Sequence, residues 1–422
     1  MAKIRDSEFW DKRISWYIVL FFIVQSLNTM IKTVFPISED IWGRLSLGFG
    51  LISVLYLLLF CIREVVRRGG KVLLLMIILF ISLYAYSLIG SYGRGDPINV
   101  TLGFSALWCF SWWLPVGVCA FTVKDYRILY SVFVKCSYIV FAVLLFCFLQ
   151  RNNIAGSKEY NMSFGFQIVI PTLIHMSEYY LKCKWYFLVL IALELVMILL
   201  YANRSILLCV SFFVVILVLF GTINYKRKFF IITAVGALVL FFFIGGDALL
   251  SDVVSLLDSK GISSRTINMM YNHNMDYDTG RGDIWNCCFT MIQEKPILGW
   301  GLGGEYYELS RRMGYVNNES IIGTHNMLIQ FFVEFGVFIG FVLCLMVIVP
   351  IFKLHKIKDT YKFLLLLVCY SATIVPCLIS AAEPMQKPAM AVFLFVYYKK
   401  TNLQINKANS YHYNQQFAIT QE

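Results

Sequence analysis

The chain has 422 residues, of which 59% are hydrophobic and only 14% are charged, whereas soluble domains carry about 25% charged residues. Apolar runs of about 20 residues, long enough to cross the roughly 30 Å hydrocarbon core of a bilayer, recur along the whole chain, which excludes a soluble globular protein. The formal net charge of +11 does not indicate a nucleic-acid partner, because Lys and Arg cluster in short loops between apolar runs, the pattern that membrane insertion produces.

The predicted fold class is an all-α integral membrane protein that forms one helical bundle of about twelve transmembrane helices. The expected spans are 16–36, 42–62, 71–90, 102–121, 128–149, 164–181, 185–202, 205–223, 229–245, 324–352, 362–380 and 384–398. Residues 1–15 and 399–422 are then tails, spans 1–9 occupy 16–245, spans 10–12 occupy 324–398, and one long loop, 246–323, separates spans 9 and 10. The hairpin at 201–205 also fits a single kinked segment, which would change the count.

The basic residues indicate the orientation. They concentrate in alternate short segments, such as 63–71 and 226–228, and cytoplasmic loops carry the excess of Lys and Arg. This predicts a multi-pass protein with both termini in the cytoplasm and the long loop on the outer face of the membrane.

Metal and redox chemistry find no support in the sequence. The twelve cysteines include no C-x-x-C pair and lie mostly inside apolar runs, where they read as small hydrophobic residues. The five histidines are far apart in the sequence. We therefore predict no metal site and no cofactor.

The long loop contains the features that indicate a site. An amphipathic helix is expected over 247–259, followed by a helix over 283–295 that Pro296 stops. Glycines at 299, 301, 303 and 304 then form a tight turn, and 305–313 is a short helix. Thr324 is expected to cap the next helix, so that His325 and Asn326 lie in its first turn.

Three arginines and one histidine are candidates for chemistry on an anionic ligand. Arg204 lies in a short outer hairpin, where it either binds an anion bidentately or reaches lipid headgroups. Arg281 stands between two glycines before a helix, where it binds an anion or pairs with Asp283 or Asp278. Arg265 is a weaker third candidate. A first-turn position favours the neutral imidazole that a general base needs, and the alternative for His325 is a structural hydrogen bond.

Four ionisable residues, Lys135, Glu178, Glu194 and Glu334, fall inside predicted spans. Glu194 is near the middle of its span and needs a partner or a water-filled cavity. Ion coupling, and therefore transport, stays open because of these residues.

Together these features resemble the O-antigen ligase and polymerase family of bacterial surface-polysaccharide assembly. The motifs are Arg204 before the eighth span, Gly-Arg-x-x-x-Trp (280–285), Pro-Ile-Leu-Gly-Trp-Gly-Leu-Gly (296–303), and His-Asn (325–326) leading into Glu-Phe-Gly (334–336). The loop motifs cover about sixty residues, and the rest of the resemblance is topology.

The resemblance implies an inverting, metal-independent glycosyltransferase of the bacterial inner membrane, similar in fold to helical lipid-sugar-dependent membrane transferases. The donor and acceptor would be glycans on undecaprenyl diphosphate, and membrane lipids and a chain-length regulator protein are further expected partners. Arg204 and Arg281 would hold the diphosphate, and His325 would serve as the base, with Glu305 and Asp283 as alternatives. The expected substrate-binding residues are Arg265, Trp285, Gly301, Gly303 and Asn326.

The preferred function is polymerisation of lipid-linked repeat units into O-antigen or capsular polysaccharide. The near alternative is the ligase, which delivers a finished glycan to lipid A core or another acceptor, as in lipopolysaccharide. A lipid-glycan transporter or flippase is the alternative of another class, but it calls for inverted repeats, and none is evident. A structural membrane protein would not need outward arginines in tight hairpins.

Overall fold

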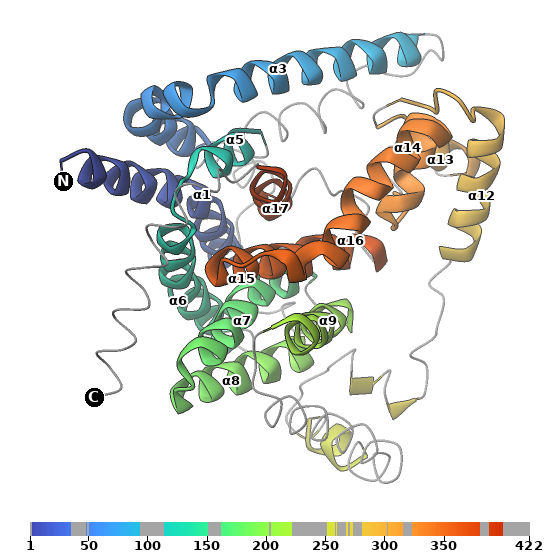
Figure 1. The fold of residues 1–422 in the computed structure, drawn as a ribbon. Helices are drawn as coiled ribbons and strands as arrows, with labels where there is room; N and C mark the ends of the chain where they lie inside the picture. The colour runs from blue at the N-terminus through green and yellow to red at the C-terminus, as the bar shows by residue number, and fades with distance from the viewer. Residues whose placement is uncertain are drawn as a thin grey trace.

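The computed structural model describes a helical protein (Figure 1). It covers residues 2–34, 48, 50–92, 114–150, 162–201, 204–221, 251–257, 259, 267–268, 271–272, 281–301, 303–314, 323–379 and 388–399. No strand occurs in these segments, which confirms the predicted all-α class.

The helical elements follow the apolar runs of the sequence. In chain order they are α1 Ala2–Val34, η1 Leu57–Cys61, α3 Ile62–Tyr92, α5 Leu114–Thr122, α6 Tyr126–Gln150, α7 Met162–Lys182, α8 Trp185–Tyr201, α9 Arg204–Phe220, α12 Arg281–Glu294, α13 Gly304–Arg312, α14 Met327–Lys353, η4 Leu354–Lys356, α15 Thr360–Cys369, η5 Tyr370–Ile374, α16 Val375–Ile379 and α17 Pro388–Tyr398.

Within the described residues, four helical stretches are long and apolar enough to cross a membrane, namely Asp6–Ile31, Tyr126–Gln150, Met327–Lys356 and Thr360–Leu378. Three shorter apolar helices, Trp185–Leu200, Ser205–Phe220 and Pro388–Tyr398, accompany them. The protein is therefore a membrane protein with several spans. The count of twelve stays a prediction, and the expected span 229–245 and most of the loop 246–280 lie outside the described residues.

The first helix extends beyond the expected span. It begins at Ala2, ahead of the predicted start of the span at residue 16, because no Gly or Pro interrupts the segment before Trp16 and its residues tolerate a helix. Residues 2–15 of the predicted tail are therefore helical, and the boundary of the span stays a prediction.

The second and third predicted spans form one helical stretch without a loop between them. The basic segment 63–71 continues the helix from η1 into α3, and the break is a single residue, Gly69, with φ −136° and ψ 16°. A Cβ at Gly69 would come within 2.7 Å of Thr122 Cγ2. The two spans thus meet at a kink that packs directly against the end of α5, because glycine leaves room for the close approach.

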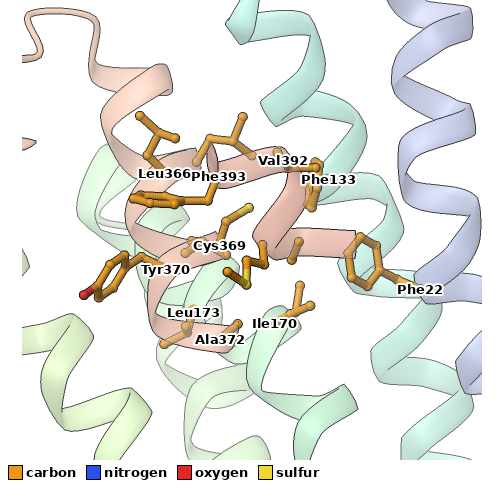
Figure 2. Close-up of a cluster of buried hydrophobic side chains, with 14 of the residues drawn as sticks. Phe22, Phe133, Ile170, Leu173, Leu366, Cys369, Tyr370, Ala372, Val392 and Phe393 are labelled. Atoms are coloured by element: carbon orange, nitrogen blue, oxygen red, sulfur yellow. The ribbon is translucent and has the colours of Figure 1, made fainter. Parts of the chain in front are cut away.

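The core of the bundle is formed by α1, α6, α7, α15, η5 and α17 (Figures 1 and 2). Figure 2 shows Phe22 of α1, Phe133 of α6, Leu173 of α7 and Phe393 of α17 around the segment α15–η5. Most of the described cysteines are buried in this packing, as the sequence predicted.

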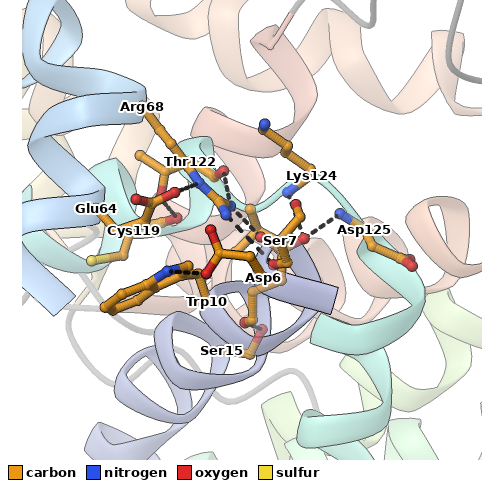
Figure 3. Close-up of polar contacts among 12 residues, drawn as sticks. Asp6, Ser7, Trp10, Ser15, Glu64, Arg68, Cys119, Thr122, Lys124 and Asp125 are labelled. Carbon is orange, nitrogen blue, oxygen red and sulfur yellow. Dashed lines mark hydrogen bonds and ion pairs between the residues drawn. The ribbon is translucent and has the colours of Figure 1, made fainter. Parts of the chain in front are cut away.

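One end of this bundle is held by a buried ionic cluster (Figure 3). Arg68, whose side chain is 5% exposed, pairs with Asp11 of α1 and with Glu64 of its own helix. The second carboxylate oxygen of Asp11 accepts hydrogen bonds from the backbone N–H groups of Lys124 and Asp125, at 3.3 and 3.0 Å. The cluster joins α1, α3 and the α5–α6 connection.

The chain after α17 reaches the same end. Lys399 Nζ donates to the carbonyl oxygen of Val123 at 2.5 Å. Burial lowers the pKa of the Lys399 amine to about 8, against the opposing attraction of Asp11. The segments 63–71 and 124–127 and the residue Lys399, which the charge pattern assigns to the cytoplasm, thus gather at one end of the bundle.

The ionic cluster generates a stability prediction with a matched control on one helix. Arg68→Ala leaves Asp11 buried with part of its charge unpaired, so we expect a loss of about 3–5 kcal/mol of unfolding free energy. Arg67→Ala removes the other arginine that pairs with Glu64, but the Arg67 side chain is 64% exposed, so little change is expected. Denaturant unfolding of the detergent-solubilised protein measures both. Equal losses for the two variants would contradict a stabilising role of burial at Arg68.

Candidate functional site

The late polar segment folds into a small unit on α14, with a hydrophobic core of its own. We call it the glycine-turn unit: α12, the turn 295–301, α13 and the first half of α14, as far as Gly336. Its core consists of Ile284, Cys288, Met291, Trp300, Leu309 and Val333. The predicted helices 283–295 and 305–313 are present as α12 and α13. In Figure 1 these helices lie together at the right of the bundle.

The turn is docked into a break in α14. At Gly336 the backbone leaves the helical conformation, with φ 73° and ψ 179°. Trp300 N donates to Val333 O at 2.8 Å, and Gly301 N donates to Glu334 O at 2.9 Å. Val337 N, which in a straight helix would bond to Val333 O, donates instead to Pro296 O at 2.7 Å. The turn thereby replaces the backbone hydrogen bonds that the break removes.

Two glycines permit this close approach. A Cβ at Gly299 would lie 2.5 Å from Glu334 O, and a Cβ at Gly336 would lie 2.2 Å from Ile297 O. Both residues also have positive φ, at 67° and 73°, which L-residues adopt only with strain. The two glycine motifs of the sequence, 296–303 and 334–336, are therefore the two halves of one contact.

The side chain of Glu334 holds the second half of the turn. It is 3% exposed, and its Oε1 accepts from Gly303 N at 2.8 Å and from Gln330 Nε2 at 3.3 Å. The amides of Gly301 and Gly303, assigned to substrate binding from the sequence, thus both donate to Glu334. Their role here is to hold the turn, and a direct contact with substrate stays a prediction.

Trp300 fixes the turn to α12 and α13. Its Nε1 donates to Met291 O at 2.9 Å, while Lys295 Nζ lies 3.8 Å and Arg312 Cζ 5.3 Å from the ring centroid. Arg312 also pairs with Glu294 and Glu308. Burial acts to raise the pKa of the Glu308 carboxyl, but hydrogen bonds from Arg311 and Arg312 outweigh it and keep that pKa below its ordinary value.

A second anchor joins α12 to the start of α14. Trp285 Nε1 donates to Thr324 O at 3.0 Å, and Thr324 is the residue before His325. Arg281 is the first residue of α12, one helical turn before Trp285 and on the same face. Through Trp285, the motif Gly-Arg-x-x-x-Trp therefore joins α12 to the residue before His325, and both Arg281 and His325 are half-buried.

His325 and Asn326 differ from the prediction in their helical positions. The N-cap of α14 is Asn326, not Thr324: its Oδ1 accepts from Leu328 N at 2.9 Å and Ile329 N at 3.2 Å. His325 precedes the cap rather than lying in the first turn, and its φ is +52°. Such a left-handed backbone costs about 1–3 kcal/mol in a residue other than glycine and is frequent at functional sites.

The capping role limits what Asn326 can offer a ligand. Its Nδ2 donates to Leu378 O at 3.2 Å, which links α14 to the end of α16. The contact of Asn326 with substrate stays a prediction. Because one N–H and the oxygen of its amide are engaged, the donor for that contact would be the second N–H.

The remaining predicted site residues differ in how much of each the structure describes and in how buried they are. Arg204 begins α9, but its side chain lies outside the described part of the structure, as does all of Arg265. Of the alternative bases, Glu305 is fully buried in α13, whereas Asp283 is exposed in the first turn of α12. Sequence reasoning assigned no role to Trp300 and considered Glu334 only as an ionisable residue inside a span, although both lie within the quoted motifs.

Metal ligands do not gather in the described segments: no group of three or more His, Cys, Asp or Glu side chains there is placed to hold a metal ion. Burial raises the pKa of the thiols of both Cys287 and Cys288, so neither favours the reactive thiolate. The charged side chains Glu294, Glu308 and Arg312 of this unit form hydrogen-bonded ion pairs with one another.

The fold and this unit define a multi-pass helical membrane protein with a polar unit built onto one long apolar helix. Residues 187–345 match the family model described as O-Antigen ligase. The match runs from α8 into α14 and includes the whole glycine-turn unit. Over this segment the match supports the O-antigen ligase/polymerase family that the motifs predicted. No curated protein matches the chain.

The match suggests a general activity. That activity is glycosyl transfer with lipid-linked glycans in O-antigen assembly, in a multi-pass inner-membrane protein. The match does not separate polymerases from ligases.

The docked turn generates a prediction with an internal control. Gly299→Ala forces both an unfavourable φ and a clash with Glu334 O, while Gly314→Ala forces an unfavourable φ of +80° with nothing within 4 Å of its Cβ. We expect Gly314→Ala to cost about 1–2 kcal/mol of stability and Gly299→Ala to cost clearly more. Thermal unfolding in detergent, together with protease sensitivity of the 281–314 region, measures the difference. If the two variants behave alike, the turn is not pressed against α14.

Proposed function

We propose that this protein polymerises undecaprenyl-diphosphate-linked oligosaccharide repeat units into O-antigen or capsular polysaccharide at the outer face of the cytoplasmic membrane. The observation that supports it most directly is the hydrogen bond from Trp285 to Thr324 O. This bond places the arginine motif of α12 beside the histidine motif of α14, within a region that matches the O-antigen ligase family.

The proposed reaction is an inverting displacement. A hydroxyl oxygen of the acceptor sugar attacks the anomeric carbon of the donor glycan. The bond between that carbon and the diphosphate oxygen breaks, and undecaprenyl diphosphate leaves with the bonding electron pair. The proton of the hydroxyl passes to His325, and the product is a glycan longer by one repeat unit or more.

The arginines take the place that a metal ion has in other transferases. Charge grows on the leaving diphosphate in the transition state, and guanidinium groups bind phosphate oxygens bidentately. We assign this role to Arg281 and Arg204, with Arg265 as a further contact, and propose a reaction without a divalent metal.

His325 is the proposed general base. It is half-buried and lies between the Trp285 anchor and the helix cap, so its backbone position is fixed from both sides. Glu305 is buried beneath the turn, which leaves Asp283 as the alternative that substrate can reach. The strained backbone at His325 supports a functional role, because strain persists where the surrounding contacts enforce it.

The orientation completes the proposal. Both termini face the cytoplasm and the loop 260–320 faces outward, where a lipid-linked glycan is presented. The grouping of the basic segments at the Arg68 end of the bundle supports this arrangement. The glycine-turn unit then stands at the outer face, and a chain-length regulator protein is a further proposed partner.

Complementation of a deletion strain tests the function. A strain without a polymerase carries single repeat units on its surface, whereas a strain without a ligase carries a bare surface and accumulates lipid-linked polymer. We expect single-unit decoration, restored to long chains by the wild-type gene. His325→Ala should restore few long chains, since a positioned base contributes roughly 10²–10⁴-fold to the rate.

The control for that experiment is His355→Ala, because His355 lies in η4 after α14, outside the glycine-turn unit, and should complement fully. A bare surface in the deletion strain would contradict the polymerase in favour of the ligase. Full complementation by His325→Ala at equal expression would remove His325 as the base.

A further inference from the structure

The tip of the glycine turn carries two large hydrophobic side chains on its surface. Ile297 and Leu298 are 64% and 60% exposed, although turn residues in proteins are ordinarily small or polar. The last exposed residues of α12 before the tip, Gln293 and Glu294, are polar. The surface of the glycine-turn unit therefore changes from polar to apolar within a few residues, at the point where the chain reaches α14.

The tip is attached to α14 at the residue where that helix becomes exposed. α12 and α14 lie beside each other (Figure 1), and Pro296 O accepts from Val337 N at 2.7 Å. No residue of α14 from Met327 to Gly336 is exposed. Beyond the break the exposed residues are large and apolar, beginning with Val337, Phe338 and Ile339. The apolar tip thus adjoins the first exposed residues of the apolar face of α14.

The apolar length of α14 places this junction inside the hydrocarbon layer. The stretch Met327–Lys356 is long and apolar enough to cross a membrane, and its sixteen residues 337–352 include no charged, amide or hydroxyl side chain. They rise about 24 Å, which is less than the roughly 30 Å of a hydrocarbon core, and tilt shortens the span further. Even when the count starts at Lys356, about 30 Å of helix reaches only to Val337. The hydrocarbon therefore extends at least to the level of the tip.

Another apolar helix shows how this protein arranges side chains at membrane depth. Glu194 of α8 is completely buried, and His175 Nδ1 of α7 lies 2.8 Å from its Oε1. This is the partner that Glu194 needs inside a span. The exposed face of α8 is apolar and includes Leu188, Val189 and Leu193. Polar groups are paired in the interior and apolar side chains are exposed, which is the arrangement that lipid selects and water does not.

The cation that adjoins the tip in sequence lies on the core of the unit. Lys295 is half-buried, and its Nζ lies 3.8 Å from the centroid of the Trp300 ring. Trp300 is buried in the core of the glycine-turn unit. Lysine and tryptophan are typical of the boundary between hydrocarbon and lipid headgroups. The charge that adjoins the tip is thus drawn onto Trp300, and the tip itself presents Ile297 and Leu298.

We propose that the tip of the glycine turn is inserted among the acyl chains of the bilayer, in the leaflet on the side of the glycine-turn unit. Ile297 and Leu298 widen the lipid-facing surface of α14 at the break. The segment that matches the family model is then held at the membrane surface and is not a loop surrounded by water. The proposal depends on α14 crossing the bilayer and does not depend on the proposed function.

Collision rates of a nitroxide spin label measure the depth of the tip. Ile297→Cys and Leu298→Cys are each labelled in the full-length protein. The background carries Cys109→Ser, Cys183→Ser and Cys287→Ser, because the other cysteines are buried. The labelled proteins are reconstituted into vesicles of phosphatidylcholine and phosphatidylglycerol. Oxygen, which concentrates in hydrocarbon, and a water-soluble nickel chelate are the two collision partners.

Two further labelled positions calibrate the measurement. Leu345→Cys replaces an exposed residue in the middle of the apolar run of α14, and Arg311→Cys replaces an arginine of α13 whose side chain is 60% exposed. At both tip positions we expect the ratio of oxygen to nickel collisions to approach that of Leu345→Cys and to exceed that of Arg311→Cys severalfold. A ratio at either tip position no higher than that of Arg311→Cys would place the tip in water. Protection from both collision partners would place it beneath another part of the protein, and either result overturns the proposal.

The wild-type protein provides a second measurement that no substitution disturbs. A phosphatidylcholine with a diazirine on one acyl chain is photolysed in the same vesicles, and its adducts are located by peptide mass spectrometry. We expect adducts on Ile297 or Leu298 as well as on Phe338 and Leu345. Adducts on Phe338 and Leu345 with none at the tip would refute insertion. Neither measurement uses transfer activity, so a failure of the insertion leaves the proposed function standing, and a failure of the proposed function leaves the insertion standing.

Discussion

The break in α14 at Gly336 is the constraint on which the rest of the described site depends. Backbone groups in an apolar environment must be paired within the protein, and at this break Val333 O, Glu334 O and Val337 N lose their helical partners. The turn 296–301 supplies all three replacements through Trp300 N, Gly301 N and Pro296 O. Because the pairing requires the backbone of Gly299 to touch that of α14, the position of α12 is set by the position of α14. The positions of Arg281 and His325 relative to each other depend on this contact between the turn and α14.

Electrostatics stabilise the protein at two separate places, and in different ways. At one end of the bundle Arg68 is buried between Asp11 and Glu64, so the ions hold helices together. In the glycine-turn unit Arg312 lies against Trp300 and pairs with Glu294 and Glu308, so the ions hold one short helix against another.

Sequence patterns predicted the helices well and their junctions poorly. Apolar length alone located α6, α7, α8, α17 and the stretch from α15 to α16 within a few residues, since runs of about this length match the thickness of a bilayer. Whether the basic segment at 63–71 is a loop or a kink depends on Gly69 packing against Thr122, a contact between residues far apart in the chain. The start of α1 was missed because a charged segment without Gly or Pro is compatible with both a tail and a helix.

The site was predicted by its motifs but not by its contacts. The glycines of 296–304 indicated a tight turn, yet only the fold reveals that its partner is the Glu-Phe-Gly segment of α14. The helix cap was placed at Thr324 because both Thr and Asn suit that position, and the bond of Asn326 to Leu378 decides between them. The pair of His175 and Glu194 had no signal beyond an acidic residue in an apolar run, because its members come from two different helices.

The central claim is that arginine, rather than a metal ion, neutralises the leaving diphosphate, and transfer by the purified protein measures it directly. The assay supplies undecaprenyl-diphosphate-linked repeat units in excess chelator and follows chain length on gels. It compares wild type with Arg281→Lys and with Arg311→Lys, an exposed arginine of the neighbouring helix α13. We expect wild type and Arg311→Lys to build long chains and Arg281→Lys to build almost none, since lysine keeps the charge but loses the bidentate fork. Wild-type yields from Arg281→Lys, or activity that appears only when magnesium or manganese is restored, would contradict the account.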